Sequence, residues 1–576
     1  MKIALCQLNT ITGNIAYNTR RIVEELTAAA ANGAQLAIFP ELAIPGYPPK
    51  DLLEYKGFIH EADAALDQVR GACTHHGIDT MVGTVHRNVF GGKKPLLNSA
   101  ALITSKGDVR FTFKKLLPTY DVFDEDRYFR PCPPDVIPPI AEYVLHRKTT
   151  RIGASVCEDI WNDNEFWKDE RLYDTDPIQA LSRLEVDMIV NISASPFVSG
   201  KPLRRVEMLR HTAKRWGRPV ILVNQVGGCD QVIFDGGSCV VLPDGSVPCA
   251  AGWFEEKTVI WDTANSATHI DFEQSAMDMT DEAAGIARAL QLGLRDYLSK
   301  TGFTQVVVGS SGGIDSAVVL ALAVDALGAE NVISVSMPGP YTSADTRSDS
   351  ATLAKGLGIR HVEVPIQAPF EAFTKELGAE GSAVIQGIFE GDDKMVCPIA
   401  NENLQSRIRG TVLMWISNAI VAPRTLVLST GNKSEMAAGY CTLYGDMAGG
   451  LALISDVPKM MVYKLARHMN VRMGGPIPQS IIDREPTAEL APNQKDSDSL
   501  PAYPVLDAIV RLFVEERQTA DEIVTSGAAP EAIVRRVVRM IELAEYKRAQ
   551  AAPGLKVTSK AFGFGRRMPI ARGQEN

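Results

Sequence analysis

The chain has 576 residues, of which 45% are hydrophobic and 22% charged, and its formal net charge is −10. This composition is typical of a globular protein of two to four domains, and the acidic balance argues against general binding of nucleic acid or of an anionic membrane. The sequence shows no apolar run long enough to span a bilayer, no signal peptide and no CxxC pair among its nine cysteines, so we expect a cytoplasmic protein with reduced thiols.

Short apolar strands dominate the first half of the chain. Two helices interrupt them, at Ala16–Ala31 and Ile59–His76. The expected strands are Lys2–Leu8, Gln35–Phe39, Thr80–Val85, Ser99–Ile103, Ile152–Val156, Asp187–Ile192, Val220–Asn224 and Ser238–Leu242. Many strands and few helices predict layered sheets that are flanked by helices.

Three loops at strand ends carry residues that could perform chemistry. Glu41 lies in IFPELAIPGYPPKDL, and Cys157 ends the strand in IGASVCEDIW. Lys114 and Lys115 lie between them, in FTFKKLLPTYDVFDEDRYFRP. Taken singly, these are the buried thiol and the solvated charges that any protein contains. Together they provide what amide hydrolysis through a thioester needs, which is a thiolate with a base and a cation close by.

In this order and spacing, the Glu, Lys and Cys resemble the triad of the nitrilase superfamily, and the resemblance covers most of residues 1–262. It implies an αββα sandwich in which Glu41 is the general base, Lys114 stabilises the tetrahedral oxyanion and Cys157 is the nucleophile. Lys115 is the alternative to Lys114, although alignment with the first Lys of the family's motif favours Lys114.

The residues after the Cys narrow the resemblance. Many nitrilases have Trp-Glu there, whereas Glu158-Asp159 follows directly in this chain, which is similar to the glutaminase domains of glutamine-dependent NAD⁺ synthetases. This resemblance implies that Ser195 and Lys201, in the loop NISASPFVSGK, hold the α-amino and carboxylate ends of glutamine, with Tyr120 across the pocket. An ordinary turn rich in Pro, Gly and Ser is the alternative explanation for this loop.

The pattern changes in the second half of the chain. Residues 263–280 are polar and lack periodicity, so we expect a linker between a domain at 1–262 and another at 281–576. Helices and strands then alternate, at Asp281–Leu298, Val306–Val308, Ile314–Leu327, Val332–Met337, Ser343–Leu357, His361–Pro365, Asn401–Val421 and Thr425–Ser429. This alternation is typical of a doubly wound, Rossmann-like parallel sheet, in which ligands lie at the carboxyl ends of the strands.

The stretch VVVGSSGGIDS, residues 306–316, joins a buried strand to a helix through a loop of small residues. Glycines and the unpaired N–H groups of a helix start favour a phosphate site. It is not a Walker A loop, because Asp315 stands where that loop has its Lys. An acid next to phosphates requires a cation between them, so we interpret Asp315 as a Mg²⁺ ligand. A helix cap is the alternative role for Asp315.

SGGIDS resembles the pyrophosphate loop of the N-type ATP pyrophosphatases, which adenylylate a carboxylate or carbonyl before ammonia displaces AMP. TGNKSE, YGD and REPTAEL follow in the order typical of NAD synthetases rather than of the GMP or asparagine enzymes. The resemblance implies ATP contacts at Gly309, Ser310, Ser311, Gly312, Gly313, Ile314, Asp315, Ser316, Thr430, Lys459 and Thr487. It implies Mg²⁺ ligands at Asp315 and Glu435, and contacts to deamido-NAD⁺ at Asn403, Arg407, Glu435 and Lys547.

The whole chain thus resembles the glutamine-dependent NAD⁺ synthetases. That implies L-glutamine, ATP and deamido-NAD⁺ as substrates, Mg²⁺ as cofactor, a homo-oligomer, and no nucleic-acid or membrane partner. Two positions depart from the ammonia-using relatives, whose substrate-binding Lys and His are Leu443 and Tyr546 here. The polar residues 488–505 are expected to form a mobile loop that closes over the site. The alternatives are a synthetase for another acid and a non-catalytic nucleotide sensor, which would require a missing motif residue.

Overall fold

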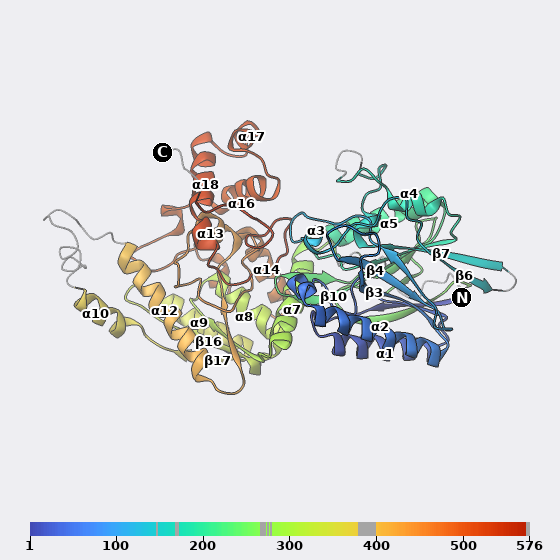
Figure 1. The fold of residues 1–576 in the computed structure, drawn as a ribbon. Helices are drawn as coiled ribbons and strands as arrows, with labels where there is room; N and C mark the ends of the chain where they lie inside the picture. The colour runs from blue at the N-terminus through green and yellow to red at the C-terminus, as the bar shows by residue number, and fades with distance from the viewer. Residues whose placement is uncertain are drawn as a thin grey trace. The chain divides into compact units, whose positions relative to one another are not determined.

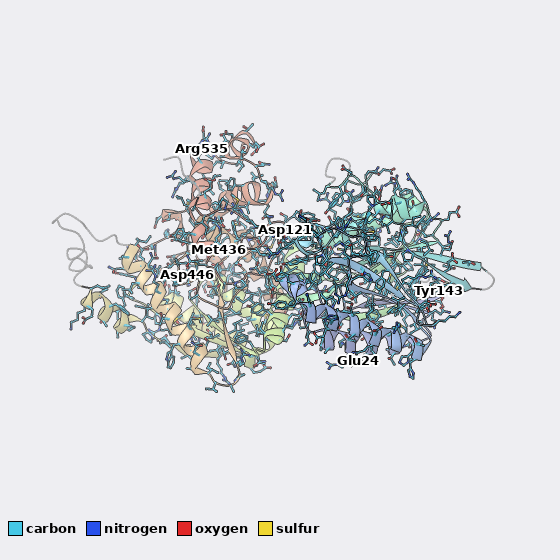
Figure 2. All side chains as sticks on the ribbon, viewed as in Figure 1. Glu24, Asp121, Tyr143, Met436, Asp446 and Arg535 are labelled. Carbon is cyan, nitrogen blue, oxygen red and sulfur yellow. The ribbon has the colours of Figure 1, made fainter. Side chains whose placement is uncertain are left out.

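The computed structural model describes residues 1–145, 148–167, 172–264, 272, 276, 279–377 and 399–571. The chain divides into two compact units, Met1–Gly285 and Ile286–Asn576 (Figure 1), and side chains fill the interior of both (Figure 2). Most of the predicted linker lies outside the described residues, so the predicted domain boundaries stay predictions. Among the helices of the described ranges, none is both long enough and apolar enough to cross a membrane.

Two six-stranded sheets form the first unit. The first sheet consists of β1 (Lys2–Gln7), β2 (Leu36–Ile38), β3 (Asp79–Arg87), β4 (Leu96–Ile103), β5 (Val109–Phe113) and β14 (Lys257–Asp262). The second consists of β6 (Ile140–Leu145), β7 (Lys148–Val156), β8 (Met188–Ser193), β9 (Val220–Asn224), β12 (Cys239–Val241) and β13 (Cys249–Ala250). Their strand orders are β14-β1-β2-β3-β4-β5 and β13-β12-β9-β8-β7-β6, while β10 (Val226–Cys229) and β11 (Val232–Asp235) form a separate pair.

The core of this unit lies between the two sheets. Ile38 of the first sheet and Val156 and Ile192 of the second belong to one buried apolar cluster. Helices α1 (Ile15–Ala31) and α2 (Lys56–His76) cover the outer face of the first sheet, and α5 (Lys201–Trp216) packs on β9 and β12 (Figure 1). This arrangement of helix, sheet, sheet and helix confirms the predicted αββα sandwich.

The predicted strands of the first unit are all present, and β9 matches its prediction at both ends. The prediction missed β5, β6, β10, β11, β13 and β14, and the helices α3 (Glu125–Tyr128), α4 (Pro177–Ser182) and α5. α5 was missed because its sequence, KPLRRVEMLRHTAKRW, carries basic residues on most turns, which hides the apolar stripe formed by Val206, Leu209 and Ala213.

A five-stranded sheet forms the centre of the second unit. Its strands are β15 (Gln305–Gly309), β16 (Val332–Ser336), β17 (Arg360–Glu363), β18 (Thr425–Ser429) and β19 (Leu451–Ala452), in the order β17-β16-β15-β18-β19. All neighbouring pairs are parallel, which confirms the predicted Rossmann-like sheet. The strand order reverses between β15 and β18, and such a switch point opens a crevice at the carboxyl ends of the strands.

Helices pack on this sheet and at its end. Within the described part of this half, the α-helices are α7 (Glu282–Thr301), α8 (Ile314–Leu327), α9 (Ala344–Leu357), α10 (Gln367–Glu376), α12 (Ile399–Ala419), α13 (Lys433–Ala438), α14 (Lys459–Met473), α15 (Gln479–Asp483), α16 (Tyr503–Val510), α17 (Ala520–Thr525), α18 (Glu531–Leu543) and α19 (Glu545–Arg548). As predicted, α8 ends at Gly328, whose φ of +85° suits glycine. The strand predicted at His361–Pro365 is wrong at its end, since β17 stops at Glu363.

Candidate active sites

The predicted triad residues of the first unit each follow the end of a strand. Glu41 follows β2, Lys114 follows β5 and Cys157 follows β7. Lys114 Nζ donates to Glu41 Oε1 at 2.8 Å, and both side chains are fully buried. Burial alone would lower the pKa of Lys114, but the carboxylates of Glu125 and Glu41 raise it well above its usual range. Lys114 therefore stays a fixed positive charge in a dry site.

Cys157 opens the short 3-10 helix η2 (Cys157–Ile160) directly at the end of β7. Its φ is +44°, a conformation that residues other than glycine rarely adopt and that clusters at functional sites. Burial, with the charge of Glu41, raises the pKa of its thiol well above the usual range, while Lys114 acts to lower it. The resting sulfur is therefore a thiol, and a base has to remove its proton before it can act as a nucleophile.

Lys115 points away from this centre. Its ammonium donates to the carbonyl oxygens of Pro134 at 2.8 Å and of Val136 at 2.9 Å. The structure therefore places Lys114, and not its rival Lys115, beside Glu41.

Glu125 belongs to the same centre, although the sequence did not reveal it. It begins the short helix α3 (Glu125–Tyr128) and is buried, with Oε1 accepting from Lys114 Nζ at 2.7 Å and from Tyr47 Oη at 2.8 Å. Burial raises the pKa of Glu125 to about 7. The run DVFDEDRYF reads as a solvated acidic loop, and nothing local distinguishes Glu125 from its acidic neighbours.

The residues predicted to bind glutamine lie on two segments next to Cys157. The Tyr120 hydroxyl donates to Glu158 Oε1 at 3.0 Å. Ser195 is buried, and its loop contacts the triad because Ala194 N donates to Glu41 Oε2 at 3.0 Å. Lys201 follows this loop as the first residue of α5, and its ammonium donates to the carbonyl oxygen of Pro196 at 3.1 Å and lies 5.2 Å from the centre of the Trp161 ring.

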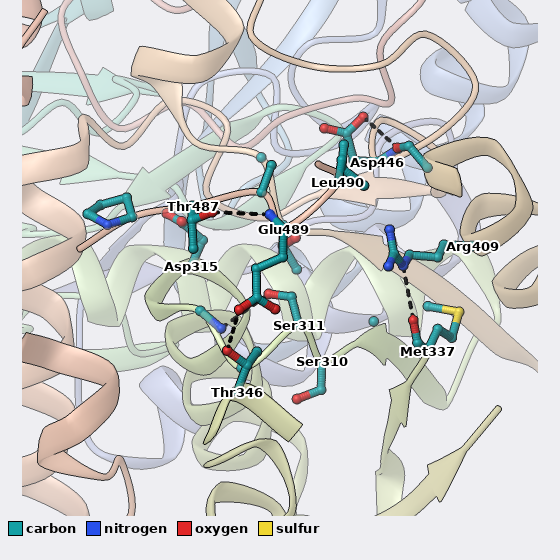
Figure 3. Close-up of a pocket in the computed structure, with 18 of the residues that line it drawn as sticks. Ser310, Ser311, Asp315, Met337, Thr346, Arg409, Asp446, Thr487, Glu489 and Leu490 are labelled. Atoms are coloured by element: carbon teal, nitrogen blue, oxygen red, sulfur yellow. Dashed lines mark hydrogen bonds between the residues drawn. The ribbon is translucent and has the colours of Figure 1, made fainter. Parts of the chain in front are cut away.

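A cavity of about 270 Å³ opens at the carboxyl ends of β15, β16 and β18 in the second unit (Figure 3). Its lining includes these predicted ligand residues: Gly309, Ser310, Ser311, Gly312, Gly313, Ile314, Asp315, Thr430, Glu435, Lys459 and Thr487. Four predicted residues do not line it: Ser316, Asn403, Arg407 and Lys547. Ser316 instead stabilises the loop, since its hydroxyl donates to the carbonyl oxygen of Gly313 at 3.0 Å.

The SGGIDS loop needs its glycine at position 312. Gly312 has φ +75°, and a Cβ there would lie 2.3 Å from the carbonyl oxygen of Thr346. Ser310 is fixed by a hydroxyl–hydroxyl contact of 2.6 Å with Ser350. The loop is thus held as a rigid turn at the start of α8, with no room for a larger residue at its tightest point.

The two predicted metal ligands converge on one lysine. Lys459 Nζ forms ion pairs with Asp315 and, at 3.3 Å, with Glu435 Oε1. Asn432 Nδ2 also donates to Asp315 Oδ1, at 2.9 Å. Burial and the charge of Asp315 raise the pKa of Glu435 to about 8. Asp315 does not cap α8, whose N-cap is Gly313, so the alternative role considered for this acid is not observed.

The three residues assigned to deamido-NAD⁺ outside the cavity all hold one short segment. Thr442 Oγ1 donates to Asn403 Oδ1 at 2.7 Å, and Arg407 Nε donates to the carbonyl oxygen of Leu443 at 3.2 Å. Lys547 Nζ donates to the carbonyl oxygens of residues 439 and 441 at 2.7 and 2.8 Å. They therefore gather on the segment 439–443, which follows α13.

Arg409 is a cavity residue that sequence reasoning missed. It lines the cavity (Figure 3), and its Nε donates to the carbonyl oxygen of Met337 at 3.0 Å. Burial lowers its pKa to about 10, while the charges of Glu489 and Asp446 act to raise it. The sequence does show Arg407 and Arg409 together in SRIRG, but only the rotation of the helix decides which one meets the cavity.

The segment predicted to close over the site lies against the cavity. Within it, Glu489 Oε1 accepts from Thr346 Oγ1 at 2.9 Å (Figure 3). Arg484, which precedes the segment, donates from Nη1 to the carbonyl oxygen of Gly312 at 3.1 Å. Gln405 Nε2 donates to the carbonyl oxygen of Leu490 at 2.9 Å. The mobility of residues 488–505 stays a prediction.

Comparison with known proteins assigns a family to each half of the chain. A family described as carbon-nitrogen hydrolase matches residues 2–268, and one described as NAD synthase matches residues 286–551. The chain is 44% identical, over 574 residues, to a glutamine-dependent NAD(+) synthetase from Synechocystis sp., with 99% of this chain and 98% of that protein covered. The chain belongs to the glutamine-dependent NAD(+) synthetases.

Other members of the glutamine-dependent NAD(+) synthetases are also similar to nearly the whole chain. The protein from Acinetobacter baylyi is 38% identical over 579 residues, with 99% of this chain and 98% of that protein covered. A solved structure of the Acinetobacter baumannii synthetase, in complex with adenosine diphosphate, has a TM-score of 0.72 and 35% identity, and covers 99% of this chain and 98% of that chain. The family and the fold class predicted from the motifs are therefore confirmed.

Proposed function

We propose that this chain hydrolyses L-glutamine to glutamate and ammonia, and uses ATP to adenylylate deamido-NAD⁺, which ammonia converts to NAD⁺ with release of AMP and pyrophosphate. The observation that carries the proposal is the buried Glu41–Lys114 pair beside Cys157, in a chain whose second unit places an ATP pyrophosphatase loop on a cavity.

Glutamine hydrolysis uses the three triad side chains in turn. Glu41 takes the proton of the Cys157 thiol as the sulfur attacks the amide carbon, which is required because the thiol is protonated at rest. Lys114 stabilises the oxyanion of the tetrahedral intermediate. Glu41 then gives the proton to the leaving nitrogen, and ammonia departs from a thioester. A water molecule deprotonated by Glu41 hydrolyses the thioester and regenerates the thiol.

The α-ammonium group of glutamine requires an anion, and Glu158 is the acid that the structure offers. Its buried carboxylate accepts from the Tyr120 hydroxyl at 3.0 Å and from the Tyr173 hydroxyl at 3.2 Å, directly beside the nucleophile. We assign the ammonium to Glu158, together with Ser195, and the substrate carboxylate to Lys201. Burial raises the pKa of Glu158, so this contact weakens as the pH falls.

Replacing Glu158 with Gln should raise the glutamine KM by roughly 10-fold or more, because a buried charge-assisted contact is lost. Synthesis from added ammonium should not change. Steady-state rates with each nitrogen donor measure both effects. Glu165→Gln, on an exposed side chain a few residues further along, is the matched control. An unchanged glutamine KM in Glu158→Gln would show that the ammonium binds elsewhere.

In the second unit, a carboxylate oxygen of deamido-NAD⁺ attacks the α-phosphorus of ATP and pyrophosphate leaves. Ammonia then attacks the acyl carbon, and AMP leaves as a far better leaving group than oxide. The N–H groups at the start of α8 and the Lys459 ammonium face the phosphate charge. Asp315 and Glu435 fit a divalent cation, because they are two acids held together at one point. Mg²⁺ bound to these acids would offset phosphate charge in the transition state.

The two arginines on α12 provide a matched test of the substrate assignments. Arg409 is desolvated and lines the cavity, and we propose that it binds an oxyanion of ATP. Arg407, with Asn403 and Lys547, is proposed to bind deamido-NAD⁺. Arg409→Met should raise the ATP KM by roughly 10-fold or more, since a charged hydrogen-bonding partner is removed. Arg407→Met should raise chiefly the deamido-NAD⁺ KM. Equal effects on both substrates in both variants would contradict these assignments.

A homo-oligomer is part of the proposal. Trp415 and Met414, near the end of α12, are 70% and 40% exposed, and this stretch of the helix is the proposed contact surface. We propose a second copy of the chain as its occupant. Sedimentation equilibrium would contradict this if it gave the mass of a single chain.

The function as a whole is tested by measuring AMP and pyrophosphate release from ATP and deamido-NAD⁺, with glutamine or ammonium as nitrogen donor. We expect release with either donor. Turnover of another carboxylic acid but not of deamido-NAD⁺ would support a synthetase for that acid. Nucleotide binding without AMP formation would support a sensor.

A further inference from the structure

Asp159 lies in η2, two residues after the nucleophile, and its side chain is buried. Its carboxylate accepts three backbone N–H groups and touches no residue of the triad. Oδ1 accepts from Lys115 N at 3.0 Å and from Leu116 N at 2.9 Å, and Oδ2 accepts from Val156 N at 3.2 Å. The proposed mechanism gives this acid no role.

The three donors flank two catalytic residues. Lys115 and Leu116 directly follow Lys114, at the end of β5 in the first sheet. Val156 directly precedes Cys157, at the end of β7 in the second sheet. One carboxylate therefore connects the strand end that carries the cation with the strand end that carries the thiol. The two residues come from different sheets, and this carboxylate joins their strand ends directly, in addition to the bond from Ala194 N to Glu41.

We propose that Asp159 is a positioning residue of the glutaminase centre, which holds the Lys114 ammonium and the Cys157 sulfur in the relative geometry that the attack on glutamine requires. This inference rests on the proposed glutaminase function. The ionised form is the active one, because a carboxylate accepts at both oxygens. A protonated acid turns one oxygen into a donor that faces an N–H group, and one contact is then lost.

The surroundings of Asp159 place its titration near neutrality. Burial raises its pKa to about 6, against the lowering effects of the three N–H groups and of the Lys114 charge. The Lys115 ammonium, which is bound to the Pro134 and Val136 carbonyl oxygens, and Asp135 share a small cavity with it. The charge of Asp159 also contributes to raising the pKa of the Cys132 thiol. As the pH falls through about 6, the acid takes up a proton and the connection loosens.

The test compares Asp159→Asn with Asp163→Asn. Asp163 is also buried and accepts backbone N–H groups, from Glu165 and Phe166, but it does not contact the segments of Lys114 or Cys157. Asp159→Asn should lower kcat with glutamine by about 100-fold, with the glutamine KM within about two-fold, because reacting groups misplaced by about 1 Å lose that much. Ammonium-supported synthesis, which also reports that the protein is folded, should not change. Asp163→Asn should keep normal kcat with glutamine.

The pH dependence separates positioning from a loss of packing. Groups with the same pKa in both proteins cancel in the ratio of wild-type to Asp159→Asn kcat, so a fall of this ratio through about pH 6 reports the ionisation of Asp159. It should be largest near about pH 8 and fall as the pH drops through about 6. A flat ratio, or a raised KM with normal kcat, would overturn the proposal.

Alkylation of Cys157 by iodoacetamide, followed by mass spectrometry of its peptide, tests the same role without glutamine. Removing a negative charge next to a thiol should by itself speed alkylation, because the thiolate becomes easier to form. Loss of the alignment between the Cys157 sulfur and Lys114 should slow alkylation by about 10-fold at about pH 8. Faster alkylation in Asp159→Asn would overturn the inference. A wild type that alkylates but does not hydrolyse glutamine would instead contradict the proposed glutaminase function.

Discussion

Replacing Cys157 with alanine should abolish synthesis from glutamine and leave synthesis from added ammonium intact. The sulfur is the only group in the glutaminase centre that can form a thioester, so the loss should reach at least roughly 10⁴-fold. Nothing in the ATP chemistry uses it, because the SGGIDS loop, Lys459 and the two acids belong to the other unit. AMP release measured with each nitrogen donor in turn gives the two rates from one preparation.

Cys249→Ala is the control for this result, since Cys249 is also buried in the first unit but lies on β13. It should keep both activities. Glu41→Gln and Lys114→Ala should lose the same activity as Cys157→Ala, and a double variant should lose little more, because residues that act as one unit are not additive. Loss of ammonium-supported synthesis in Cys157→Ala would mean that the sulfur has a different role. Full activity with glutamine would refute the triad.

Asp315→Asn should reduce synthesis with either nitrogen donor, by roughly 100-fold to 1,000-fold, which is what the loss of one preorganised charge in an active site costs. The substitution keeps the shape of the side chain but removes the charge that pairs with Lys459 and, with Glu435, forms the proposed Mg²⁺ site. The Mg²⁺ concentration that gives half-maximal AMP release should rise. A titration of the rate with Mg²⁺ measures both effects.

Asp325 offers a matched control for Asp315. Both acids lie on α8 and pair with basic residues of α14, Asp315 with Lys459 and Asp325 with Arg472, but Asp325 lies far along the helix and does not line the cavity. Asp325→Asn should therefore keep normal synthesis. Equal losses of synthesis in the two variants would mean that the loss comes from weakened packing of α8 on α14 and not from a lost metal ligand. Normal synthesis by Asp315→Asn at ordinary Mg²⁺ would exclude the metal role.

Much of the fold and of the ATP loop could be predicted because their signals are local. The strand Val220–Asn224 and the strand Thr425–Ser429 match at both ends, since short apolar runs bounded by polar residues have few alternatives. The φ of +75° at Gly312 is a local requirement for glycine, whereas the carbonyl oxygen that leaves no room for a Cβ there belongs to Thr346 of α9. Helix α5 was missed because basic residues on its solvent side outweigh its apolar stripe.

The sequence by itself determined that Glu41 and Cys157 each follow a strand, and the order of Glu41, Lys114 and Cys157 predicted that they could meet, although the strand before Lys114 was missed. Only the tertiary structure decided between Lys114 and Lys115, because consecutive residues at a strand end point in different directions. The tertiary structure also added Glu125 to the glutaminase centre and Arg409 to the lining of the cavity. Tyr47, which bonds Glu125, lies 78 residues away along the chain. The contacts of Arg409 depend on the rotation of α12, where two residues apart means about 200° around the axis. Local patterns fix backbone conformation, whereas contacts between distant segments arise only when the sheets and helices pack.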